Sequence, residues 1–327
     1  MSKPKPTIFI IGGTGAQGIP IIRGLAQNNT YTIRLAALGP NVHLLRGTFT
    51  SESDLRAGFT GAWGAYIHID GFTTGEALEI FFTARCYKIA VKCGVKFYVH
   101  GNIGFYYKLS GYNPAYRCGH GGERAMRVAA LTTGPYMDMA LSAFTPVSPA
   151  IERDEETGEE VGAVAHTSLD DLQYYARWLF DHYADDEVDG MNLEVGIDYI
   201  HYRDVAKAFE KVTGRKARFV DGDLETYFSE GGFSNNAELP TGYMVSKDSL
   251  AAMSVKENFT GWWNAWRASG GNEGVVKRDY ALLDKIYPGR TRSVEGFFQK
   301  EAEKAEREGR GTLWDVVASR KVVLKHQ

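Results

Sequence analysis

The sequence predicts an α/β fold in which a parallel sheet is covered by helices on both faces. The apolar, β-branched run Thr7–Ile11 lies near the start of the chain, and glycines spaced three apart follow it at once. Beyond these glycines, short apolar runs alternate with stretches of helical periodicity, as the connections of a parallel sheet require. A strand that turns through glycines into a helix, followed by this alternation, is typical of a doubly wound, Rossmann-like sheet.

Each glycine of the run has a role where a strand turns into a helix that faces a diphosphate. Gly12 lets the chain turn sharply, Gly15 lets backbone N–H groups approach a pyrophosphate, and Gly18 lets the helix pack on the strand. The helix N-terminus adds unpaired N–H donors and a positive dipole end. A glycine triplet alone is usually a structural turn, but its place between strand and helix favours dinucleotide binding. We expect the loop as a whole to contact the cofactor: Gly12, Thr14, Gly15, Ala16, Gln17 and Gly18.

The other elements are expected in alternation along the chain. Strands are predicted near residues 7–11, 31–34, 42–46, 63–69, 95–100 and 126–132. Helices are predicted at residues 16–28, 51–59, 74–93, 168–182, 201–213 and 293–307. We expect a dinucleotide-binding domain over residues 1–150 and a smaller carboxyl-terminal substrate lobe over residues 151–327, which closes over the cleft.

Composition narrows the class of protein. The 327 residues are 44% hydrophobic and carry a net charge of −3, which is ordinary for a globular protein and argues against a nucleic-acid-binding surface. Cys86, Cys93 and Cys118 show no metal-ligand spacing, the eight histidines are scattered, and reduced core thiols are the plain interpretation. No apolar run approaches the length of a membrane span, and we expect a soluble, cytoplasmic protein without a metal.

Later segments are more specific than the glycine motif. They are residues 71–76, 110–114, 116–120, 131–136 and 258–263. Together with residues 12–18, they resemble the NmrA-like group of atypical short-chain dehydrogenases, in particular its fungal members, over nearly the whole chain. The resemblance implies a fold similar to isoflavone-reductase-like enzymes. It also implies either an NADP(H)-dependent reductase or a protein that binds the dinucleotide and acts as a redox sensor or corepressor.

The chain departs from the family pattern at three places. Arg34 runs directly into Leu35, and only seven residues separate the second and third expected strands, whereas a parallel crossover needs about a dozen or more. The Gly-His pair ending at His120 lacks the lysine that follows it in the family, and an acidic run begins after Ile151. Either this crossover is reduced or chain is missing here. We expect interruptions near Arg34–Leu35, near His120–Glu123 and within Ile151–Ala165.

The remaining cofactor contacts are expected at the carboxyl ends of the strands, where open α/β sheets bind ligands. These residues are Arg34, Phe49, Ile67, His68, Gly101, Asn102, Pro135 and Tyr136. Arg34 stands at the end of the second strand without an acidic neighbour that would hold ribose hydroxyls. A guanidinium suits phosphate geometry, so this position favours NADP(H) over NAD(H).

The candidates for proton transfer have less support in the sequence than the cofactor contacts have. Lys108 follows the fifth strand closely and could reach a ribose or substrate oxygen, although an ordinary solvated lysine fits as well. The resemblance places His120 near the cleft, where it would contact the cofactor or substrate or make a structural hydrogen bond. Tyr112 is either a pocket-wall residue or part of the core. Tyr243 and Lys247 match the Tyr-x-x-x-Lys spacing of short-chain dehydrogenases, but they lie far downstream of the fifth strand, and we regard the match as coincidence.

The sequence therefore predicts an NADP(H)-binding protein that reduces a small carbonyl, imine or conjugated substrate. The alternative is a non-catalytic dinucleotide sensor that acts through a protein partner, and a homodimer is compatible with either. A degenerate Rossmann protein that binds nothing is the third interpretation, because fold alone does not supply a reaction.

Overall fold

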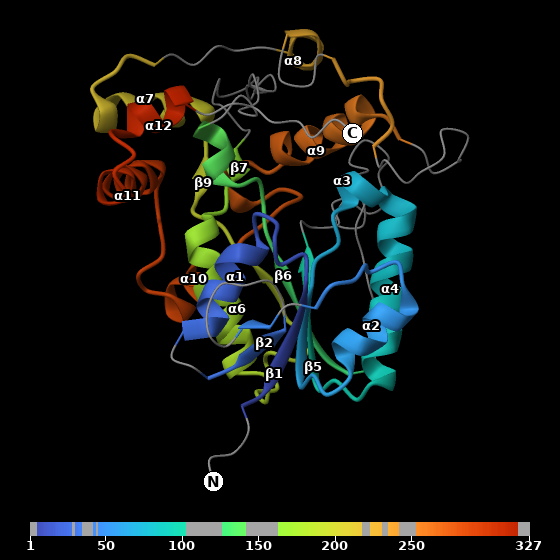
Figure 1. The fold of residues 1–327 in the computed structure, drawn as a ribbon. Helices are drawn as coiled ribbons and strands as arrows, with labels where there is room; N and C mark the ends of the chain where they lie inside the picture. The colour runs from blue at the N-terminus through green and yellow to red at the C-terminus, as the bar shows by residue number, and fades with distance from the viewer. Residues whose placement is uncertain are drawn as a thin grey trace.

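Figure 1 shows a computed structural model in which a parallel sheet flanked by helices lies below a mainly helical lobe. The structure describes residues 5–27, 30–34, 42–43, 45–102, 126–141, 163–217, 223–230, 235–241 and 253–319.

Among the described residues, seven strands form one sheet in the order β3-β2-β1-β4-β5-β6-β8, and every neighbouring pair is parallel. Their bounds are Thr7–Ile11 (β1), Thr32–Arg34 (β2), Val42–His43 (β3), Gly64–Ile67 (β4), Phe97–Asn102 (β5), Arg127–Thr132 (β6) and Asn192–Glu194 (β8). The order reverses between β1 and β4, which is the point where doubly wound sheets bind ligands. The predicted fold class is confirmed, and β1 to β6 lie where the sequence predicts strands.

Helices cover both faces of the sheet (Figure 1). One face carries α1 (Gly18–Ala26), α6 (Leu169–Asp181) and α10 (Tyr280–Ile286), and the other carries α2 (Glu52–Phe59) and α4 (Glu76–Lys92). The short helix α3 (Gly71–Thr74) packs beside α4. Side chains of β1 alternate between the two layers. Ile8 and Ile10 belong to the core under α1 and α6, whereas Phe9 belongs to the core under α2 and α4. Burial on both faces explains why this strand is an unbroken apolar run.

The helix predicted over residues 74–93 is confirmed as α4, which begins two residues later at Glu76. Gly75 separates α3 from α4 with φ of +74°, a left-handed conformation that glycine adopts without a steric cost. The predicted start thus included Thr74, which belongs to α3, and the glycine between the two helices.

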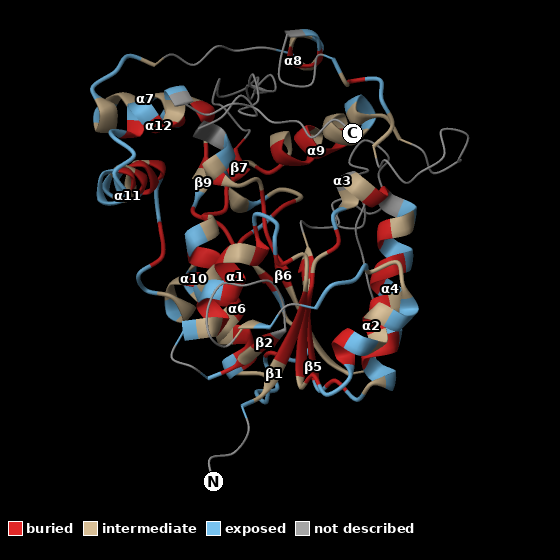
Figure 2. Cartoon of the chain, viewed as in Figure 1, coloured by how far each residue is buried: buried red, intermediate tan, exposed pale blue. Residues whose placement is uncertain are grey.

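The lobe above the sheet has its own apolar core. It contains the two-stranded antiparallel pair β7 (Val164–Ala165) and β9 (Tyr199–Ile200), with α7 (Tyr202–Thr213), α8 (Leu224–Glu230), α9 (Val255–Arg267), α11 (Val294–Arg307) and α12 (Leu313–Ser319). Figure 2 shows that the buried residues of α9 and α11 face the interior. Trp262, Trp263 and Trp266 of α9 pack there with Phe298 of α11. The predicted helices at 201–213 and 293–307 are confirmed as α7 and α11.

Both halves of the chain contribute to the sheet. α6 packs beside α1, and β8 pairs with β6 on the same sheet, although both elements follow residue 150. The division of the chain into domains at residue 150 therefore stays a prediction.

The short link after β2 leads to a third parallel strand. Ile33 pairs with Val42, and Arg34 pairs with His43, so the register between β2 and β3 is parallel as predicted. The interruption expected near Arg34–Leu35 concerns residues 35–41, which lie outside the described residues. The interruption expected at 120–123 lies outside them as well, and so does most of the one expected within 151–165.

Candidate functional site

The glycine loop lies at the carboxyl end of β1, directly at the switch point of the sheet. Gly12 has φ of +81°, and a Cβ there would lie 2.5 Å from the carbonyl oxygen of His68. A Cβ at Gly18 would collide with the backbone of Gly12 and Gly13. At Gly15 the restriction is milder, because a Cβ would lie 3.3 Å from the Gly12 oxygen. Gly12 and Gly18 are therefore required by the fold, whereas glycine at position 15 leaves the surface of the loop free of a side chain.

Most backbone N–H groups in the first turn of α1 have partners in the loop. The Ile19 N–H donates to the Gly15 oxygen at 3.2 Å, the Ile21 N–H donates to the Gln17 oxygen at 3.3 Å, and residue 20 is a proline without an N–H. Gln17 stands at the N-cap, but its side chain makes no capping hydrogen bond, and this turn contains no acidic residue. The positive end of the helix dipole nevertheless favours negative charge at this place. The loop and the helix start together form a cradle that fits a diphosphate.

The side chain of Gln17 joins three elements instead. Only 1% of this residue is exposed. Its Nε2 donates to Thr133 Oγ1 at 3.2 Å and to the Tyr136 hydroxyl at 2.7 Å. Its Oε1 accepts a hydrogen bond from the Tyr66 hydroxyl at 2.9 Å. The glycine loop, β4 and the segment after β6 therefore meet at one buried amide, and we refer to Gln17, Tyr66, Thr133 and Tyr136 as the Gln17 cluster.

Other predicted residues lie beside this cluster. His68 Nδ1 lies 3.2 Å from the Gly101 carbonyl oxygen, and the backbone N–H of Thr133 donates to the Asn102 oxygen at 2.9 Å. A Cβ at Gly101 would collide with the Tyr66 hydroxyl, so glycine is required there for space. The structure thus brings His68, Gly101 and Asn102 together with the glycine loop at one edge of the sheet.

Three predicted positions differ in what their side chains do. The Ile67 side chain is fully buried in the core under α2 and α4, so only its backbone faces the cleft edge. Phe49 packs edge-on against Phe82 of α4, with ring centroids 5.2 Å apart. Arg34 ends β2, and its backbone pairs with Phe9 and His43, while its side chain lies outside the described part of the structure.

The proton-transfer candidates cannot be placed. Lys108, Tyr112 and His120 all lie outside the described residues, and so do Tyr243 and Lys247. They remain predictions from the sequence.

Burial keeps the phenols of the Gln17 cluster in their neutral form. It raises the pKa of Tyr136 to about 12, although the hydrogen bond from Gln17 acts in the opposite direction. The pKa of Tyr66 is raised well above its ordinary value, again chiefly by burial. Both hydroxyls therefore keep their protons near neutral pH and serve as hydrogen-bond groups rather than as bases.

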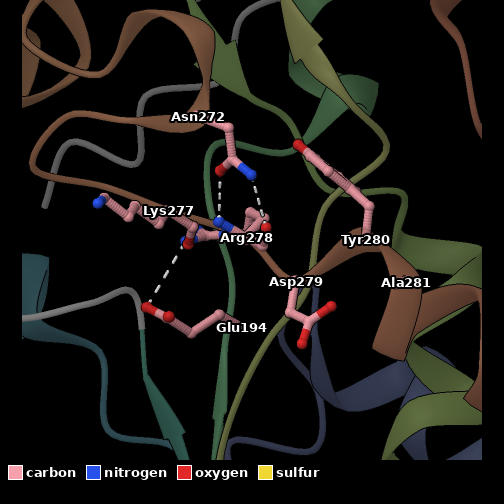
Figure 3. A pocket seen from close by; sticks show the side chains of 7 residues that line it. All are labelled: Glu194, Asn272, Lys277, Arg278, Asp279, Tyr280 and Ala281. Carbon is pink, nitrogen blue, oxygen red and sulfur yellow. Dashed lines mark hydrogen bonds and ion pairs between the residues drawn. The ribbon is translucent and has the colours of Figure 1, made fainter.

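A pocket of about 560 Å³ lies beside the end of β8 (Figure 3). It is lined by Glu194, Asn272, Lys277, Arg278, Asp279, Tyr280 and Ala281. The buried Arg278 donates from Nε to the Val195 oxygen at 3.1 Å and from Nη2 to the Thr133 oxygen at 3.4 Å. Its Nη1 lies 3.6 Å from Glu194 Oε1. Thr133 thus connects this pocket to the Gln17 cluster.

Sequence reasoning did not find Glu194, Arg278 or Tyr66 as parts of the site. Glu194 has a signal in the sequence, because it stands between the apolar residues Leu193 and Val195 in a short alternating segment. Tyr66 interrupts an apolar strand, and a phenol inside such a strand needs a buried partner. Arg278 gives no comparable pattern, since its partners are backbone oxygens far away in the chain.

The sheet order and the glycine loop at its switch point define a Rossmann-like protein. No family model matches the chain. An NmrA-like family domain-containing oxidoreductase, lnaB of Aspergillus flavus, is 32% identical over 114 residues, which are 29% of this chain and 34% of that protein. The chain thus spans about a third of the length of this curated relative in the match.

Solved structures of other proteins match the fold of this chain over almost its whole length. NmrA, a negative transcriptional regulator solved in complex with NADP, has a TM-score of 0.61 at 15% identity, and the match covers 95% of this chain and 99% of NmrA. The triphenylmethane reductase of Citrobacter sp., solved with NADP(H), has a TM-score of 0.60 at 14% identity and covers 90% of this chain and 99% of its own. The resemblance to NmrA-like proteins is therefore confirmed, in sequence over part of the chain and in fold over nearly all of it.

The described part of the chain lacks two further kinds of feature. No helix there is both long and apolar enough to cross a membrane. Within the same residues, His, Cys, Asp and Glu side chains do not gather in threes or more in a way that could hold a metal ion.

Proposed function

We propose that this chain binds NADP(H) across the switch point between β1 and β4 and reduces a small carbonyl, imine or conjugated substrate. The observation that carries the proposal is the glycine loop. The backbone conformation of the loop, its close approach to the end of β4 and the positive end of the α1 dipole support a diphosphate site where doubly wound sheets bind dinucleotides. The names of the relatives support it, since they include an oxidoreductase and a reductase solved with NADP(H).

The choice of NADP(H) over NAD(H) rests on Arg34. This residue ends β2, next to β1, at the place where a doubly wound sheet recognises the adenosine ribose. An arginine there favours a 2′-phosphate, and the sequence offers no acidic residue beside it to hold a 2′-hydroxyl.

In this proposal the bound cofactor supplies the hydride, and the chain supplies position and electrostatics. The glycine loop would hold the diphosphate, and the segment from Thr133 to Tyr136 would lie along the nicotinamide half. We place the substrate towards the pocket at Glu194 and Tyr280, because Thr133 contacts both this pocket's Arg278 and Gln17. Lys108, Tyr112 and His120 stay candidates for the proton donor.

A non-catalytic sensor is the second candidate function. It is favoured by the match in fold to NmrA, whose structure is described as that of a negative transcriptional regulator. In that case dinucleotide binding would shift the chain between conformers that differ in affinity for a protein partner.

Two measurements distinguish these functions. Titration of the purified chain with NADPH and with NADH, followed by nucleotide fluorescence, should give saturable binding with a lower Kd for NADPH. Tighter NADH binding would contradict the assignment of Arg34. Oxidation of NADPH should then be followed in the presence of aldehydes, ketones, imines and quinones. Turnover of a member of this panel supports the reductase, whereas tight binding without turnover of any member supports the sensor.

A further inference from the structure

The buried side chain of Gln17 makes its hydrogen bonds within the protein. Both hydrogens of its amide are donated, to Thr133 and Tyr136, and its oxygen accepts from Tyr66. With 1% of the residue exposed, the amide has neither surface nor spare hydrogens to offer a ligand. Its place within the glycine motif suggests a cofactor contact, but its geometry indicates a different role.

The partners of Gln17 all lie on one side of the switch point. Tyr66 lies on β4, while Thr133 and Tyr136 follow β6. A dinucleotide spans the switch point, with its adenosine half towards β1 and β2 and its nicotinamide half towards β4 and the strands beyond it. The amide therefore connects the diphosphate loop to the walls of the nicotinamide half and makes no contact with the adenosine half.

The hydrogen bonds continue from the cluster into the cleft edge. Thr133 Oγ1 lies 3.3 Å from the Asn102 oxygen, to which it donates, and its backbone N–H binds the same oxygen at 2.9 Å. The Tyr66 hydroxyl fills the space that the absent side chain of Gly101 leaves. Loss of the amide would therefore disturb the hydrogen bonds and packing at the ends of β4, β5 and β6 together.

We infer that Gln17 is a positioning residue that sets the distance between the diphosphate loop and the nicotinamide-side wall at Thr133–Tyr136. The inference rests on the proposed function. Without the amide, Tyr66 and Tyr136 would each retain a buried hydroxyl that has lost a partner. Such groups are costly to leave unpaired, and the segment after β6 would shift to satisfy them.

Gln17→Met tests this role, because methionine has a similar length and lacks the amide. The probes are NADPH, which spans both halves of the site, and 2′,5′-ADP, which occupies the adenosine half alone. The variant should bind NADPH on the order of tenfold more weakly, while its Kd for 2′,5′-ADP should stay within about twofold of the wild type. If the wild type prefers NADH, the same comparison is made with NADH and AMP.

Gln27→Met is the matched control. Gln27 follows α1, is exposed, and makes one side-chain hydrogen bond, from its Nε2 to Gln173 Oε1 at 2.9 Å. This variant should leave both dissociation constants unchanged.

Tyr66→Phe is a second variant that keeps the test decisive if Gln17→Met does not fold. Tyr66 is fully buried, so it cannot touch a ligand, and the change removes only the hydroxyl that binds Gln17. It should weaken NADPH binding by about threefold and leave 2′,5′-ADP unaffected.

The outcomes separate this inference from the proposed function. Equal losses of affinity for NADPH and for 2′,5′-ADP would mean that Gln17 only supports the fold. Unchanged NADPH binding in both variants would mean that the Gln17 cluster does not set the distance between the diphosphate loop and the wall at Thr133–Tyr136. Either result overturns the inference while leaving dinucleotide binding in place. A wild-type chain that binds neither NADPH nor NADH would overturn the proposed function itself.

Discussion

His166 shows how strongly a single buried residue can link stability to pH. It is 2% exposed, and its Nε2 lies 3.2 Å from the Tyr202 hydroxyl. Burial lowers the pKa of His166 to about 4, although the backbone of Pro135 and Tyr136 acts in the opposite direction. In the unfolded chain the pKa returns to about 6.5. Between these values the unfolded state binds more protons, so stability is lost as the pH falls from 6.5 to 4.

We therefore expect His166→Gln to remove this dependence, because glutamine does not titrate and can still reach Tyr202. The free energy of unfolding of the wild type, relative to the variant, should fall by about 3 kcal/mol between pH 7 and pH 4. Urea denaturation of both proteins at the two pH values measures this difference, in which the contributions of other titrating groups cancel. A difference that does not change with pH would show that His166 is not buried as a neutral ring.

At the scale of residues, the sequence predicted the glycines better than the polar side chains. The roles of Gly12 and Gly18 follow from backbone geometry, which a strand-turn-helix pattern already implies. The role of Gln17 does not, because its partners come from two other elements, and only the fold brings them to one amide.

At the scale of elements, the contact between α1 and α6 holds the glycine loop to the body of the sheet. Gly24 lies at this contact and is buried, and a Cβ there would lie 2.7 Å from the Cβ of Gln173 and closer still to its carbonyl oxygen. The helices can approach this closely only because Gly24 has no side chain.

Gly24→Ala should therefore lower the free energy of unfolding by about 2 kcal/mol, although alanine is the better helix former, because the clash is with backbone that must move. Arg23→Ala is the control, since Arg23 is exposed on the same helix and should change stability by less than about 0.5 kcal/mol. Chemical denaturation measures both. A Gly24→Ala variant at least as stable as the wild type would mean that α1 and α6 can separate without cost.

The strands of the large sheet up to β6 were predicted, whereas the two-stranded pair of the lobe was not. The strands β7 and β9 have two residues each, too few for alternation to be recognised. The helix α9 could have been predicted, because Ser254 and Glu257 form a capping box at its start. Its aromatic and glycine content conceals the helical period that follows.

At the scale of the whole molecule, the sequence predicted the architecture but not the substrate. Alternating apolar runs determine a parallel sheet, and the glycine loop determines where its ligand binds. The pocket between Glu194 and Tyr280 depends on the packing of the carboxyl-terminal lobe on the strand ends, which no local pattern encodes.

The central claim is that the glycine loop binds a dinucleotide, and Gly15→Val tests it most directly. Among the three motif glycines, Gly15 offers a new side chain the most room, so the fold should survive, whereas the valine would occupy the space of the diphosphate. Gly296→Val in α11 is the matched control. A Cβ at Gly296 would lie 3.2 Å from Ser293 Oγ, which is similar to the contact at Gly15, and α11 belongs to the lobe, far from the glycine loop.

Calorimetric titration with NADPH should give saturable binding for the wild type and for Gly296→Val. For a folded Gly15→Val, the account predicts no measurable binding. NADPH binding of wild-type affinity in folded Gly15→Val would contradict the account.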